Sequence, residues 1–434
     1  MELSESLQRW FSSAQRVSLT FIDPAHLDGE ERTESISVHV YEPEDPSEAD
    51  ACITFLHGYP SCSLDFEPLV EQLLQDKTLR ARLLLVDMLG YGDSDKGVGE
   101  ARFSISQQAN VVQAVWARFN VKRTHLVVHD FAVSVAQELL SKQPKGRLPI
   151  PIHKVFWLNG SVFTDLYRPT ELQQRLMADM TGWLTARSLT QSAFEQVVGG
   201  VFSREHPPPR QWLTDIHQAL QHRGGAQIHH KLVRFIKDRH RYKHIWQGAL
   251  ELAMRFDSSR MMFFWGAQDP MSGAHVAEEL KRRFGRYNVK ISVHEDLGHW
   301  PHIEDPARVA QALTAFIAEP WTPVWPVVAE SGSATSPTME KGSSVSVHNG
   351  SVHYPEGKSG HRRQSMALER NSKIPGSALD RTSGIPRTVQ RSNSATDENT
   401  FVQKPCPSPS ASTTMLSAVN AAAKLEVEAV PAIV

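Results

Sequence analysis

Three side chains of this sequence have the types and the order that nucleophilic catalysis needs. Asp130 stands at the end of an apolar run, Asp269 in the loop after a later run, and His299 after the last run. Short apolar runs predict buried strands, and open sheets of parallel strands place their sites at the carboxyl ends of those strands. A carboxylate, a second acid and a histidine that meet there can act as nucleophile, orienting acid and base. We therefore predict a catalytic set of Asp130, Asp269 and His299.

The residues around Asp130 have the pattern of a nucleophile elbow. The sequence Val128-His129-Asp130-Phe131-Ala132 matches small–x–nucleophile–x–small, although Val128 is larger than the ideal residue. In the α/β-hydrolase fold this pattern marks a strained strand-to-helix turn that lifts the central side chain above the sheet. An anion there is stabilised by the N-terminus of the next helix. The alternative interpretation of Asp130 alone is a solvated N-cap of that helix.

A second loop supplies hydrogen-bond donors. In FLHGYPSCS (55–63) a glycine allows the backbone to approach the site, and Pro60 fixes the turn, with a cis peptide as one option. The backbone N–H groups of Tyr59 and Phe131 then form the predicted oxyanion hole.

His302 competes with His299 for the role of base. We prefer His299, because Gly298 gives the turn freedom and a helix is predicted to start at Pro306. The histidines lack metal-ligand spacing such as His-Glu-x-x-His, so we expect neither a metal ion nor an organic cofactor.

Strands and helices alternate along the first 320 residues. The runs that predict parallel strands are 51–56, 82–87, 125–130, 154–159, 260–266 and 289–295, and two alternating stretches, 16–22 and 34–42, predict an antiparallel edge. This order indicates an α/β-hydrolase fold with a mainly parallel sheet and helices on both faces. Residues 161–255 have helical patterns only. The predicted domains are a core of 1–160 and 256–320, a helical cap of 161–255 and a tail of 321–434.

Composition excludes several classes of protein. The chain has 434 residues, of which 40% are hydrophobic and 22% charged, with a net charge of −2. A nucleic-acid binder usually has a clear basic excess. Three cysteines build neither a disulfide framework nor a cysteine-based zinc site. The polar N-terminus predicts no signal peptide, and no apolar run predicts a membrane span. We expect a cytoplasmic protein, and we leave open a peripheral association with the endoplasmic reticulum.

The tail is rich in Ser, Thr, Pro and Gly and lacks periodic apolar residues, so we predict that it is disordered. Ser365 and Ser394 follow arginines and suit kinases that prefer basic sequences. The simpler interpretation is a flexible tail with chance matches.

Several motifs resemble the epoxide hydrolase and haloalkane dehalogenase branch of the α/β-hydrolase superfamily. HDFA resembles its His-Asp-aromatic-Gly elbow, HGYP its His-Gly-x-Pro loop, and VDMLGYGDSDKG (86–97) its Asp-x-x-Gly-x-Gly-x-Ser-Asp-Lys loop. The resemblance covers about residues 15–320. Ala132 replaces the elbow glycine, which tightens the turn. Phe131 replaces the tryptophan that holds halide in dehalogenases, and its lack of a side-chain N–H counts against dehalogenation.

The resemblance implies that Asp130 forms an alkyl-enzyme ester with a small lipophilic substrate, and that water activated by His299 hydrolyses this ester. We expect the substrate to bind in an apolar pocket between cap and sheet. In the resembling enzymes, cap tyrosines protonate the leaving oxygen. The cap here offers Tyr167 and Tyr242, and we favour Tyr242, which lies near the return to the core.

Two other functions remain open. The domain could be a degenerate hydrolase that serves as a binding or scaffold protein, a reading that Ala132 and the small supply of tyrosines motivate. Hydrolysis of esters or acyl lipids shares the fold but normally uses a serine at the elbow. Ser134 lies one helical turn beyond that position.

Overall fold

The apolar runs of the sequence form one sheet of eight strands among the described residues, in the order β1-β2-β4-β3-β5-β6-β7-β8. The strands are β1 (Gln15–Ile22), β2 (Glu31–Tyr41), β3 (Ala51–Leu56), β4 (Ala81–Val86), β5 (Thr124–Val128), β6 (Ile152–Trp157), β7 (Met261–Gly266) and β8 (Lys290–His294). β2 pairs antiparallel with both β1 and β4, whereas the other neighbours pair in parallel. The predicted parallel sheet with an antiparallel edge is confirmed.

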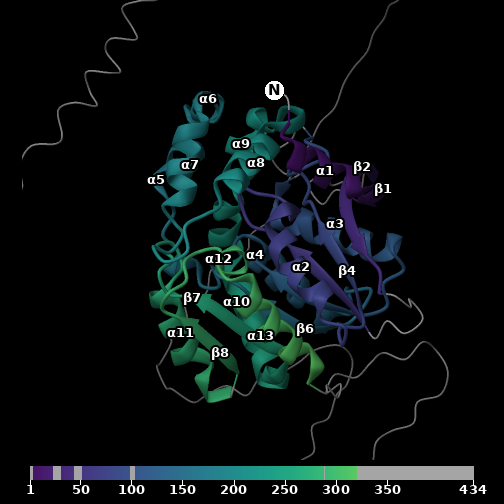
Figure 1. Cartoon of the computed structure of the whole chain (residues 1–434). Helices are drawn as coiled ribbons and strands as arrows, with labels where there is room; N and C mark the ends of the chain where they lie inside the picture. Colours follow the sequence, from purple (N-terminus) through teal and green to yellow (C-terminus); the bar gives the residue numbers. More distant parts are fainter. Residues whose placement is uncertain (1–2, 23–30, 44–50, 98–102, 288, 320–434) are drawn as a thin grey trace, which may run out of the picture. The chain divides into compact units, whose positions relative to one another are not determined.

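The structure is a computed structural model that describes residues 3–22, 31–43, 51–97, 103–287 and 289–319 (Figure 1). The predicted tail with Ser365 and Ser394 lies outside the described residues. Within the described ranges, no helix combines the length and the apolar character that a membrane span requires.

Helices cover both faces of the sheet because its strands are apolar on both sides. In β4, Leu83 and Leu85 belong to one apolar cluster, and Leu84 and Val86 belong to the other. The first cluster includes residues of α1 (Glu5–Ser13), α2 (Glu67–Gln75), α12 (Pro301–Glu304) and α13 (Pro306–Ala318). The second includes residues of α3 (Ile105–Arg118), α4 (Ala132–Lys142) and α11 (Ala274–Phe284). The loops that leave the strands are thereby held between two packed layers.

The segment predicted as a cap holds six α-helices between β6 and β7. They are α5 (Glu171–Met177), α6 (Gly182–Ser188), α7 (Gln191–Gly199), α8 (Arg210–Gln221), α9 (Gly225–Leu232) and α10 (Phe235–Asp257). In Figure 1, α5, α6 and α7 stand together beside α8 and α9. The division into core and cap domains stays a prediction.

The helical patterns at residues 171–189 and 228–254 are each interrupted in the structure. The first breaks after α5, where Ala178 has an extended backbone with ψ of 120°. Gly182 then starts α6 so close to α5 that a β-carbon there would lie 2.2 Å from the carbonyl oxygen of Leu176. The second break separates α9 from α10 at residues 233–234. The breaks let the cap fold into short helices.

Candidate active site

The backbone at Asp130 forms a strained turn between a strand and a helix. β5 ends at Val128, α4 begins at Ala132, and Asp130 has a φ of +48°, a left-handed conformation that residues other than glycine seldom adopt. The N–H of Asp130 donates to the carbonyl oxygen of Asn159 at 2.8 Å. Gly160 lies so near that a β-carbon there would meet the Asp130 carbonyl oxygen at 2.6 Å. The chain thus adopts the turn that the elbow pattern predicts, with a carboxylate at its centre.

The two carboxylate oxygens of Asp130 have different surroundings. The side chain is buried, and its Oδ2 accepts a hydrogen bond from the Tyr59 backbone N–H at 3.0 Å. Oδ1 has no hydrogen-bond partner among the described residues. Tyr59 precedes Pro60 through a cis peptide bond, as the sequence allowed. Phe131 caps the N-terminus of α4, and the predicted role of its N–H stays a prediction.

His299 and Asp269 form a buried hydrogen-bonded pair. His299 Nδ1 donates to Asp269 Oδ2 at 2.8 Å, and His299 Nε2 has no partner among the described residues. Asp269 Oδ2 also accepts from Ser272 Oγ at 2.6 Å and from Asn159 Nδ2 at 3.1 Å, while Oδ1 accepts from the Met271 N–H at 2.8 Å. One ring nitrogen is therefore fixed by a carboxylate, and the other can take a proton.

The pair also sets the protonation of both groups. Burial alone would lower the pKa of His299, but the Asp269 charge and hydrogen bond, together with the charge of Asp130, raise that pKa above its ordinary value. Burial alone would raise the pKa of Asp269, but the His299 charge and the hydrogen bonds hold it below its ordinary value. Asp269 is therefore an anion that stabilises a protonated His299.

His302, the competing base, has a different environment. Its ring is buried, packs on Phe66 at 4.8 Å between ring centroids and on His129 at 4.6 Å, and neither ring nitrogen has a hydrogen-bond partner among the described residues. Burial, and then the charge of His299, lower the pKa of His302 to about 3. The geometry thus brings His299 to Asp269 and keeps His302 neutral.

Among the described residues, one cluster of three side chains has the residue types and the closeness that a metal ion needs: Asp65, His129 and His302. Their ligand atoms lie within 4.8 Å of one another, and all three side chains are buried. Burial raises the pKa of Asp65 to about 7. The group could hold a cation, but the chemistry of Asp130 and His299 described below does not use one.

The two cap tyrosines lie in different places. The hydroxyl of Tyr167 donates to Gln173 at 2.9 Å, and burial, followed by the charge of Asp130, raises its pKa. Tyr242 packs on Trp246, with 5.5 Å between ring centroids. The structure records no contact of Tyr242 with Asp130 among the residues it describes. Of the two cap tyrosines, Tyr167 is therefore the one on which the charge of Asp130 acts.

Arg239 of α10 reaches the elbow, which the sequence did not indicate. Its side chain is buried, and its Nη2 lies 3.7 Å from Asp130 Oδ1 and donates to the Asp130 carbonyl oxygen at 3.2 Å. Its Nε donates to Ser134 Oγ at 3.0 Å, so that hydroxyl binds an arginine. The segment KDRHRYKH around Arg239 is rich in basic residues, and only its inward position distinguishes Arg239 from them.

A small apolar pocket lies beside Tyr59. It has a volume of about 30 Å³ and is lined by Tyr59, Pro60, Met271 and Trp300 together with the cap residues Thr170, Leu172, Gln173, Phe194, Val197, Val198 and Val201. Larger hollows of about 290 and 350 Å³ share Leu79, Arg80 and Ala81, at the start of β4. None of these three linings includes Asp130, Asp269 or His299, but the apolar pocket includes Tyr59, which donates to Asp130, and Met271, which donates to Asp269. The apolar pocket adjoins the predicted site, and the larger hollows lie at the opposite ends of the strands.

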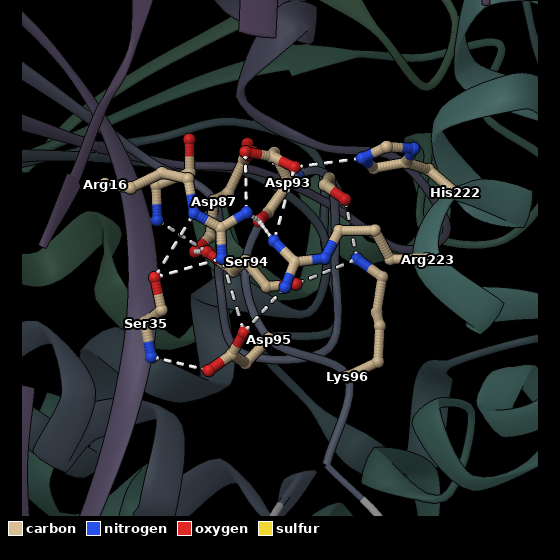
Figure 2. Close-up of polar contacts among 11 residues, drawn as sticks. Arg16, Ser35, Asp87, Asp93, Ser94, Asp95, Lys96, His222 and Arg223 are labelled. Carbon is tan, nitrogen blue, oxygen red and sulfur yellow. Dashed lines mark hydrogen bonds and ion pairs between the residues drawn. The ribbon is translucent and has the colours of Figure 1, made fainter. Parts of the chain in front are cut away.

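Polar contacts join the loop after β4 to the cap (Figure 2). Asp87 Oδ2 accepts from the N–H of Asp93 at 2.8 Å. The Asp93 carboxylate pairs with Arg16 of β1 and with His222, each at 2.9 Å. Arg223 donates to the backbone carbonyl oxygen of Asp93 at 3.2 Å. His222 and Arg223 follow α8, so this loop fixes the cap helices relative to the sheet.

Comparisons with known proteins agree with this architecture. The model of the α/β hydrolase fold family matches residues 52–306. LipZ of Mycobacterium tuberculosis, a protein named as a hydrolase, is 30% identical over 264 residues, which are 61% of this chain and 87% of LipZ. The human mesoderm-specific transcript homolog protein is 29% identical over 272 residues, which are 61% of this chain and 78% of that protein.

A solved haloalkane dehalogenase of Agrobacterium tumefaciens has the same fold. It superposes with a TM-score of 0.53 at 16% identity, covering 71% of this chain and 98% of the dehalogenase. The predicted resemblance to this group of hydrolases is confirmed at the level of the fold. From the family match and the sheet, the chain belongs to the α/β-hydrolase fold family.

Proposed function

We propose that the protein is a hydrolase that forms an alkyl-enzyme ester on Asp130, with an epoxide as the substrate class. The observation that carries the proposal is the contrast between the two carboxylate oxygens. Oδ2 accepts the Tyr59 N–H at 3.0 Å, whereas Oδ1 has no hydrogen-bond partner among the described residues. An oxygen that is buried and accepts no hydrogen bond is suited to attack carbon.

In the first step, Asp130 Oδ1 attacks an epoxide carbon. The new C–O ester bond forms as the ring C–O bond breaks, and the ring oxygen leaves with the electron pair and takes a proton. Tyr167 is the better placed of the two cap tyrosines, because its ring centroid lies 4.7 Å from the guanidinium carbon of Arg239, which is paired with Asp130. Tyr242, favoured from the sequence, packs against Trp246.

In the second step, water hydrolyses the ester. His299 Nε2 takes a proton from water, and the oxygen attacks the carboxyl carbon of Asp130. Asp269 stabilises the protonated ring through the 2.8 Å hydrogen bond. The oxyanion receives the N–H of Tyr59 and, as the sequence predicts, that of Phe131. Collapse breaks the ester bond, and the departing oxygen takes the proton held by His299. The new carboxyl group of Asp130 loses its proton and Tyr167 regains one, which restores both groups and completes the diol.

The choice of Asp130 over a serine nucleophile rests on the position and the hydrogen bond of Ser134. Ser134 Oγ lies one turn into α4 and accepts a hydrogen bond from Arg239 at 3.0 Å. A hydroxyl paired with a guanidinium has no base to take its proton. This argues against ester hydrolysis through Ser134.

The test is rapid mixing of the His299→Ala variant with a panel of lipophilic epoxides, followed by mass spectrometry of the tryptic peptide 124–142. Without its base, the variant accumulates an adduct, and fragmentation assigns it to Asp130 rather than to Glu138. His302→Gln is the matched control, because that ring is equally buried, and it turns over without accumulation. No adduct with any epoxide in the panel favours a binding or scaffold protein.

A further inference from the structure

Arg239 is a buried cation with an unused hydrogen-bond donor. Its side chain is 1% exposed. Nε donates to Ser134 Oγ and Nη2 to the carbonyl oxygen of Asp130, but Nη1 donates to none of the described residues. A buried donor without a partner is unfavourable because it has lost its hydrogen bonds to water, and more so when it is charged. An acceptor that arrives with the substrate would remove this penalty.

The charge of Arg239 is balanced by Asp130. Their closest atoms, Nη2 and Oδ1, are 3.7 Å apart, which is longer than a hydrogen bond. The other close neighbours are the rings of Phe235 and Tyr167, with centroids 4.5 and 4.7 Å from the guanidinium carbon. Aromatic faces attract a cation but carry no net charge. Asp130 is the one carboxylate that the described residues place in an ion pair with Arg239.

Ester formation would remove this balance. When Oδ1 bonds to carbon, Asp130 becomes neutral while Arg239 stays charged, because a guanidinium does not lose its proton in proteins. Removing one partner of a buried ion pair is strongly unfavourable. A substrate that carries its own anion would replace the lost charge, and the oxygen that attacks is the one facing Arg239.

We infer that Arg239 binds a carboxylate that the substrate carries next to the carbon attacked by Asp130. This inference rests on the proposed function and narrows its substrate class to epoxy acids with an apolar remainder. With oxirane-2-carboxylate, Oδ1 bonds to a ring carbon, and the ring oxygen leaves with the electron pair and takes a proton. The carboxylate then faces Nη1 and Nη2 while Asp130 is an ester.

The first test compares oxirane-2-carboxylate with its neutral amide in the His299→Ala background, with and without Arg239→Gln. The rate of adduct formation on peptide 124–142 is measured for each compound. Arg239→Gln is expected to lower the ratio of acid rate to amide rate by about 10- to 100-fold, the range typical of a hydrogen bond to a charged group. The ratio cancels the intrinsic reactivity of the two compounds, and Arg239→Lys restores part of it. An equal loss for both compounds overturns the inference and indicates a role at the leaving oxygen.

The second test separates this inference from the proposed function. Asp130→Asn removes the charge that pairs with Arg239, as ester formation would. The full chain with this substitution is expected to bind propionate about 10- to 100-fold more tightly than wild type, and the added Arg239→Gln abolishes the gain. If Asp130→Asn binds propionate but no epoxide forms an adduct in His299→Ala, the anion site is supported and Asp130 is refuted as the nucleophile. Adducts on Asp130 without propionate binding to Asp130→Asn refute the anion site alone.

Discussion

The substitution Asp269→Asn separates the two proposed steps. Asp269 Oδ2 accepts from three donors, His299 Nδ1, Ser272 Oγ and Asn159 Nδ2, and Oδ1 accepts from the Met271 N–H. An asparagine has only one oxygen. If the asparagine oxygen faces the three donors, its NH₂ group faces the Met271 N–H, and two donors oppose each other. In the reverse orientation the NH₂ group faces all three donors, which is worse. His299 also loses the charge that stabilises its protonated form.

The size of the effect follows from the pair that is lost. A hydrogen bond to a charged group contributes about 1.5–3 kcal/mol, and breaking a buried ion pair costs about 3–5 kcal/mol. A loss of about 2–5 kcal/mol in the hydrolytic transition state slows ester decay by about 30- to 5,000-fold. Attack by Asp130 does not use His299, so the rise of the ester should change little.

The assay is rapid-quench mass spectrometry of peptide 124–142, which records the rise and the decay of the ester in one experiment. An unchanged rise shows that the site is folded. Ser272→Ala is the matched control, because it removes one hydrogen bond to Asp269 and leaves the charge, and it should slow decay far less. An equal slowing of rise and decay in Asp269→Asn would refute the assignment of Asp269 to the second step.

Three further outcomes are expected. Gly58→Ala would put a β-carbon 2.6 Å from Nδ1 of the buried His129 ring, so the free energy of unfolding in urea should fall by about 1–3 kcal/mol, and an unchanged value would contradict this packing. Ester decay should become faster as pH rises and level off once His299 is neutral, because its pKa is raised and only the neutral ring accepts a proton; decay that slows with rising pH would exclude His299 as the base. His229 and His302 are buried with pKa values lowered to about 3 from 6.5, so between these values the unfolded chain binds protons that the folded chain does not. The free energy of unfolding should therefore fall below pH 6.5, by up to about 1.4 kcal/mol per pH unit for each ring, and His302→Gln should reduce the slope measured by urea titration.

The sheet could be predicted because its parallel strands are short apolar runs, whereas its two edge strands alternate apolar and polar residues. Parallel strands place the loops that follow them at one edge, so the positions of Asp130, Asp269 and His299 after three such strands predict that they come together. The hydrogen bond between His299 and Asp269 at 2.8 Å agrees with that reasoning. The left-handed backbone of Asp130 agrees with the pattern of small residues around it.

The cap could be predicted only as helical. Which side of α10 faces the elbow depends on how short helices pack, and the basic segment around Arg239 gives no sign of it. For the same reason, position along the chain favours Tyr242 over Tyr167, whereas Tyr242 packs on Trp246 one turn further along α10 and the described residues record no contact between Tyr242 and Asp130. The interruption between α5 and α6 brings Gly182 close to Leu176, a contact that is visible only in three dimensions.

The most direct test of the central claim is a single turnover in ¹⁸O-labelled water, with the first epoxide that gives an adduct. If water attacks the carboxyl carbon of an ester, the heavy oxygen enters Asp130 and the diol receives its new oxygen from the protein. Peptide 124–142 should then carry the label at Asp130, and the diol of the first turnover should not. Label in the first diol with none in Asp130 would mean that water attacks the epoxide directly, and Asp130 would not be the nucleophile.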